Sequence, residues 1–76
     1  MPNRIEPMAL KAVGVKGMMH HAQVKALRNY IFYTPESDII AEIGLITDKR
    51  VFNILLEVGL NARLQEELDK RWIKLM

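Results

Sequence analysis

The residues best suited to metal chemistry stand together at positions 18–21, which read Met-Met-His-His. Thioether and imidazole groups bind soft metal ions, so this run is the first candidate site. Neighbouring helical residues point about 100° apart, however, so His20 and His21 cannot close on one ion as histidines spaced i, i+4 do. No cysteine or nearby carboxylate completes a coordination shell. We therefore expect no metal site, with one histidine packed and the other in solvent.

Nucleophilic and phosphate-binding chemistry find equally little support. Ser37 is the only serine, and it lies in a pattern typical of a helix N-terminus. Gly14 and Gly17 are too close together for a phosphate-binding loop, and no Gly-Lys-Ser/Thr follows them. We expect no catalytic residue, no cofactor and no enzymatic activity, and we interpret the glycines as turns and helix ends.

The composition indicates a domain that buries apolar surface against a partner. The chain has 76 residues, half of them hydrophobic, and no cysteine. A single domain of this size buries only roughly 60% of its unfolded surface, so a solitary fold is marginal. Disulfides are excluded, which leaves self-association as the leading explanation for the apolar excess. No signal peptide or membrane span is evident, and we expect a cytoplasmic protein without membrane contact.

Charge is distributed unevenly along the chain. The net charge is +2, but residues 1–33 carry five basic side chains and one acidic one, whereas residues 34–76 carry six and eight. A basic first half suits a nucleic-acid backbone or an acidic protein surface. The alternative is that a few lysines keep an apolar domain soluble.

Hydrophobic spacing and helix-end signals predict an all-α fold. We expect a flexible N-terminus over residues 1–6 and a single helical domain over residues 7–76. The domain is a compact array of four to five short helices, over residues 7–13, 18–33, 35–43, 48–58 and 62–75. The β-branched valines leave a short strand over residues 10–16 as an open alternative to the end of the first helix.

The helix ends carry recognisable signals. Thr34, Thr47 and Asn61 are predicted N-caps, because their side-chain oxygens can accept hydrogen bonds from the first turn. Gly44 and Gly59 each stand between an acidic-apolar pair and a leucine, which predicts the same glycine stop at both places.

Residues 38–58 contain a short helix with an alanine, a glycine–apolar turn, a capping residue and a second helix. This stretch resembles the helix-turn-helix form, which implies a second helix that enters the major groove of DNA. The implied reading residues are Thr47, Lys49, Arg50 and Asn53, with Lys25 and Arg28 of the earlier helix on the DNA backbone. The alternative is a plain helical hairpin inside a bundle.

The last helix carries an apolar stripe that could form an interface. Its members recur at i, i+4, i+8 and i+11 and are Leu64, Leu68, Trp72 and Leu75. The stripe could close the core of one chain or pair with its copy in a homodimer, with Trp72 as an anchor.

Three functions are consistent with these features. The first is a small DNA-binding transcriptional regulator that acts as a homodimer on duplex DNA. The second is a helical adaptor or inhibitor that binds another protein through apolar helix faces. The third is a structural subunit of a larger assembly.

Overall fold

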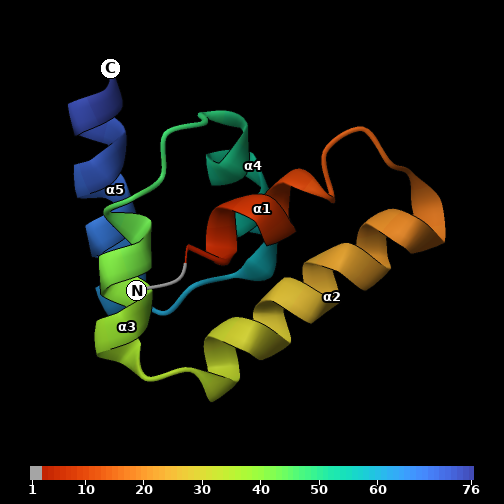
Figure 1. Cartoon of the computed structure of the whole chain (residues 1–76), viewed down its shortest axis with the longest axis horizontal. Helices are drawn as coiled ribbons and strands as arrows, with labels where there is room; N and C mark the ends of the chain where they lie inside the picture. The colour runs from red at the N-terminus through yellow and green to blue at the C-terminus, as the bar shows by residue number, and fades with distance from the viewer. Residues whose placement is uncertain (1–2) are drawn as a thin grey trace.

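Five helices form within residues 3–76, the part of the chain that the computed structural model describes (Figure 1). They are α1 (Ile5–Leu10), α2 (Gly17–Tyr33), α3 (Glu36–Ile43), α4 (Arg50–Val58) and α5 (Ala62–Leu75). No strand occurs in this range. The prediction of an all-α array of four to five short helices is confirmed.

The start of the chain differs from the expectation in detail. Helix α1 begins at Ile5, two residues before Pro7, and ends at Leu10. Residues 11–14 form a turn, so the open choice between helix and strand at 10–16 resolves to neither. The first two residues of the expected flexible segment 1–6 lie outside the described range, whereas Ile5 is fully buried.

The caps were predicted correctly at one of three helices. The Asn61 side chain accepts a hydrogen bond from the Leu64 N–H at 2.9 Å, as expected. The prediction for Thr34 is wrong, because its hydroxyl donates to the carbonyl of Tyr30 in the preceding helix. The prediction for Thr47 is also wrong, because Asp48 instead accepts from the N–H of Arg50 at 3.0 Å.

The two glycine stops use different geometry. Gly59 follows α4 with φ +78° and ψ 72°, the left-handed conformation that favours glycine. Gly44 follows α3 with φ −65°, an ordinary helical value. Tight turns close α3 instead, because the N–H groups of Leu45 and Ile46 bond to the carbonyls of Glu42 and Ile43. The expectation that both glycines act alike is therefore wrong.

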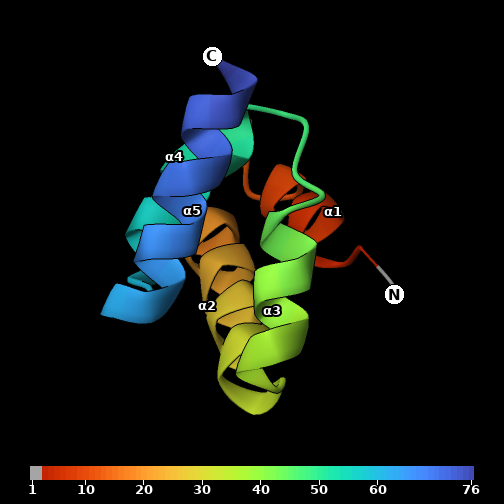
Figure 2. The same ribbon diagram turned by 90° about the vertical axis from the view of Figure 1, so that its left-hand side faces the viewer.

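Helix α1 packs against three of the other four helices. It contacts α2, α3 and α4, while α2 also packs on α4 and α3 packs on α5 (Figures 1 and 2). The radius of gyration is 11.5 Å, close to the roughly 11 Å expected for a compact chain of this length. One copy of the chain therefore closes a core by itself.

Every helix contributes to that core. Fully buried side chains include Ile5, Leu27, Ile39, Ile43, Ile46, Val51 and Leu55. Each such side chain contributes about 1.5–3 kcal/mol relative to an exposed position.

Glu42 of α3 is buried with this core, at 1% exposure. Its Oε1 accepts hydrogen bonds from the backbone N–H groups of Arg4 (2.7 Å) and Ile5 (3.0 Å). Its Oε2 accepts one from the Tyr30 hydroxyl at 2.5 Å. The carboxyl group thus satisfies donors at the start of α1 that have no partner within the helix, and it ties α1, α2 and α3 together.

Candidate interaction surfaces

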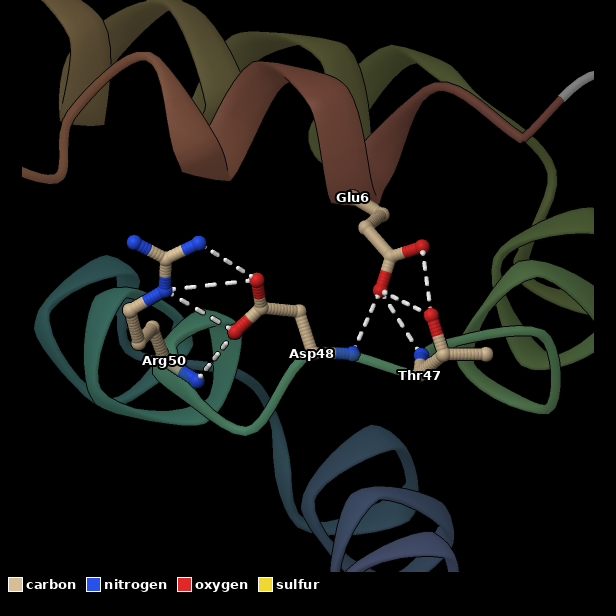
Figure 3. A network of polar contacts seen from close by, with 4 residues as sticks. All are labelled: Glu6, Thr47, Asp48 and Arg50. Atoms are coloured by element: carbon tan, nitrogen blue, oxygen red, sulfur yellow. Dashed lines mark hydrogen bonds and ion pairs between the residues drawn. The ribbon is translucent and has the colours of Figure 1, made fainter.

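A polar network joins α1 to the connection between α3 and α4 (Figure 3). Glu6 Oε2 accepts hydrogen bonds from the backbone N–H groups of Thr47 (2.7 Å) and Asp48 (2.8 Å), and the Thr47 hydroxyl lies 3.3 Å from both Glu6 oxygens. Partial burial raises the pKa of Glu6, but these N–H and hydroxyl donors outweigh it and lower the pKa overall. Thr47, a predicted DNA-reading residue, is therefore held by α1.

Arg50 is bound within the same network. Its guanidinium contacts both carboxylate oxygens of Asp48, and the shortest contact joins Nη2 to Oδ2 at 2.7 Å. The hydrogen bonds from the Arg50 side chain and backbone lower the pKa of Asp48 below its ordinary value of 3.8. Contact with a phosphate or a guanine would require Arg50 to share or exchange this partner.

Arg28 lies at the other end of α4. Its Nε donates to the carbonyl of Val58 at 3.0 Å, and its Nη2 donates to the carbonyl of Glu57 at 3.1 Å. These carbonyls belong to the last turn of α4, where carbonyl groups have no N–H partner within the helix. Arg28 therefore caps α4 from α2.

The other three predicted DNA-binding residues are exposed. Lys25 lies on the outward side of α2, and Asn53 lies on α4. Lys49 precedes α4, with its Nζ 6.0 Å from the centroid of the Trp72 ring. All six predicted residues are therefore exposed, and three of them, Thr47, Arg50 and Arg28, also make contacts within the fold.

The helix pair expected to read DNA does not pack as a pair. Helix α3 contacts mainly α5, and α4 contacts mainly α1 and α2. Helix α1 lies against both of them and holds their connection through Glu6. In a helix-turn-helix the first helix packs against the second and supports it. Here α1, and not α3, packs against α4 in this way.

The apolar stripe of α5 mostly faces the core of its own chain. Leu64 and Leu68 are buried at 4% and 2% exposure, and Leu75 is half-buried. Trp72 lies at the edge, 39% exposed, with its ring edge-on to Phe52 at a centroid distance of 5.0 Å. Only Trp72 and part of Leu75 therefore remain for contact with another molecule.

Sequence reasoning considered the outward side of α2 only as a basic surface and missed its exposed apolar side chains. This surface, hereafter the α2 outer face, is exposed along its whole length and comprises Met18, Met19, Ala22, Lys25, Asn29, Phe32 and Tyr33. Its methionines and aromatic residues are 64–88% exposed. The available signal was the even spread of apolar residues around this helix, which is wider than one buried side requires.

The histidine pair behaves as a structural contact. His20 Nδ1 lies 2.9 Å from the Ala12 carbonyl, and its Nε2 lies 2.6 Å from Glu57 Oε2. These hydrogen bonds, the carbonyl first and the carboxylate second, raise the pKa of His20 above 6.5. His21 is exposed. No cluster of three metal-ligating side chains occurs within residues 3–76.

Comparison with protein-family models, with curated proteins and with solved structures finds no match to this chain. Over the described range, no helix is both long and apolar enough to cross a membrane. The inference of function therefore depends on the surfaces themselves.

Proposed function

We propose that this chain is a small protein-interaction module that binds an acidic amphipathic helix of another protein along the α2 outer face. One observation carries the proposal. Four large apolar side chains remain in solvent on a single helix, at 88% for Met18, 64% for Met19, 79% for Phe32 and 81% for Tyr33. Exposed apolar clusters mark interaction surfaces, and methionine and aromatic residues are enriched there. Here two such pairs stand at the two ends of one helix face.

The spacing of this surface fits a helical partner. Met18, Ala22, Lys25, Asn29 and Phe32 recur at alternating intervals of four and three residues. This is the interval at which one helix meets another along a seam. Large side chains lie at both ends and the small Ala22 lies between them, so a second helix can approach closely in the middle.

The charge of α2 favours an acidic partner. The helix has no aspartate or glutamate, and its exposed side carries Lys25 and His21. Complementary charge steers association and excludes basic partners.

DNA is the competing ligand. Protein–DNA interfaces are strongly positive because they neutralise several phosphates. The α2 outer face presents four large apolar side chains beside one lysine, while Arg28 and Arg50 are engaged within the fold. These features favour a protein partner over DNA.

Site-specific photocrosslinking in the native host tests the proposal. A photoreactive residue replaces Asn29 on the α2 outer face, or Glu66 on the exposed side of α5 as a control. We expect one protein to crosslink at position 29 and not at 66, through a segment that is acidic and amphipathic. The purified segment should then bind the wild-type chain. Equal crosslinking at both positions, or a basic segment, would overturn the proposal.

Matched variants give the second readout. Phe32→Ser should weaken binding of that segment at least about tenfold, because aromatic anchors dominate interface energies. Ile73→Ser removes an apolar residue of comparable exposure, 70% against 79%, from α5 and should leave binding unchanged. A labelled DNA duplex forms the opposing arm. Duplex binding that falls steeply with salt and is lost in Arg50→Ala would favour the regulator function instead.

A further inference from the structure

A groove runs between α4 and α5 on a part of the surface separate from the α2 outer face. It encloses about 200 Å³. Its apolar lining is formed by Phe52, Leu56, Leu68 and Trp72, and Gln65 and Asp69 stand on the α5 side. We refer to it below as the α4–α5 groove.

Two of the apolar residues are available to another molecule. Leu56 is 61% exposed and Trp72 is 39% exposed. The edge-on contact with Phe52 holds the Trp72 ring in place, so little conformational entropy is lost when the ring is covered. Tryptophan is also the residue type most enriched among interface anchors.

The rim of the α4–α5 groove carries one charge of each sign. Lys49 stands on the α4 side near Trp72, and within residues 3–76 it forms no ion pair. Asp69 stands on the α5 side one turn before Trp72, and its Oδ1 accepts a hydrogen bond from Gln65 but forms no ion pair within the described residues. Both charges are therefore free to pair with an incoming surface.

The neighbouring charges are already paired within the chain. Arg50 binds Asp48, His20 binds Glu57, and Lys70 lies 3.6 Å from Glu66. The rim is thus neutral in sum, with its cation and anion on opposite walls. Such a surface complements its own copy, whereas the α2 outer face carries one lysine and no acidic side chain.

We propose that two copies of this chain associate through the α4–α5 groove, with Leu56 and Trp72 at the centre and Lys49 of each copy paired with Asp69 of the other. A two-fold axis along the groove places α4 of one copy against α5 of the other, so the ion pair forms twice. An interface confined to this groove belongs to the small class of protein–protein interfaces, so we expect the association to be weak.

A charge-swap experiment tests the proposal by sedimentation velocity at chain concentrations up to about 0.5 mM, where weak dimers of this size assemble. The wild type should dimerise. Lys49→Glu and Asp69→Lys should each weaken the dimer at least about tenfold, because each places like charges opposite one another twice. The two variants mixed together should form a heterodimer, and the double variant should dimerise like the wild type.

The control is Lys25→Glu, which makes the same charge change on α2 and should leave the dimer intact. Circular dichroism checks that each variant is folded. A wild type that stays monomeric, single variants that dimerise normally, or a mixture that fails to form the heterodimer would each overturn the proposal. Loss of the dimer in Phe32→Ser alone would place self-association on the α2 outer face and overturn it as well. The dimer and the proposed helical partner use different surfaces. The outcome of the sedimentation experiment therefore neither supports nor contradicts the outcome of the crosslinking experiment.

Discussion

The carboxyl group of Glu42 is buried in the interior and accepts hydrogen bonds from three donors. Two are the N–H groups of Arg4 and Ile5, and the third is the Tyr30 hydroxyl. Burial first, and the neighbouring Glu42 second, raise the pKa of Tyr30, so its hydroxyl keeps the proton that it donates. The contact joins the middle of the chain to its beginning.

Tyr30→Phe removes one of these donors and leaves Glu42 Oε2 buried without it. We expect the free energy of unfolding to fall by about 1–3 kcal/mol, the usual cost of an unsatisfied buried polar group. Urea denaturation measures the change. Tyr33→Phe is the matched control, because Tyr33 is 81% exposed, and its stability should equal that of the wild type. Equal stability of both variants would show that the Tyr30 contact contributes nothing.

His20 makes stability depend on pH. The Ala12 carbonyl can only accept, so Nδ1 carries a proton, and the Glu57 carboxylate favours a second proton on Nε2. The folded state therefore favours the imidazolium, and the pKa of His20 is raised above 6.5. A raised pKa gives a stabilisation that is complete below pH 6.5 and is lost as pH rises through the raised value.

Thermal unfolding of His20→Gln across this range tests the linkage. The advantage of the wild type over His20→Gln should be largest near pH 5.5 and should shrink as the pH rises above about 6.5 through the raised pKa. His21→Gln should follow the wild type throughout, because His21 is exposed. A constant difference between wild type and His20→Gln would contradict the assignment.

At the scale of the element, α4 depends on its neighbours at both ends. Glu6 of α1 binds the backbone that leads into it, and Arg28 of α2 binds the carbonyls where it ends. A helix this short is marginal alone, so these contacts and its buried side decide that it forms. Arg28 and Thr47, which suit DNA contact by residue type, thus make contacts that stabilise the two ends of α4.

Gly59→Ala tests the left-handed stop of α4. A Cβ at this position meets no atom within 4 Å, so its cost is that of the backbone alone. At φ +78° we expect a loss of about 1–2 kcal/mol in the free energy of unfolding, measured by urea denaturation. Gly44→Ala is the control, because φ is −65° there and the new Cβ would lie 3.3 Å from the Ala41 carbonyl oxygen. It should change stability by less than about 1 kcal/mol. A larger loss at position 44 than at 59 would contradict the assigned conformations.

At the scale of the whole molecule, the apolar excess of the sequence is divided between a closed core and the surface. Nine large apolar side chains within residues 3–76 stay exposed, four of them on the α2 outer face. A helical partner on the α2 outer face and a second copy at the α4–α5 groove would each cover part of that excess. A dimer through the α4–α5 groove would leave the α2 outer face of each copy open to its partner.

The sequence by itself determined the helical class and most helix boundaries. The interval of apolar residues, Pro35 after α2, and the Asn61 cap are local signals, and each acts within a few residues of the chain. The left-handed Gly59 belongs with them, because backbone conformation at that position depends on the absence of a Cβ.

Only the tertiary structure decided how the polar residues are used. Glu42 and Glu6 reach backbone groups about 40 positions away, and Arg28 and His20 reach α4 across similar separations. Such pairs depend on which helices come together, and no local spacing encodes that. The same reason explains why Thr34 and Thr47 do not cap the helices that follow them. It also explains why the contacts of α2 with α1 and α4 leave several of its apolar side chains exposed.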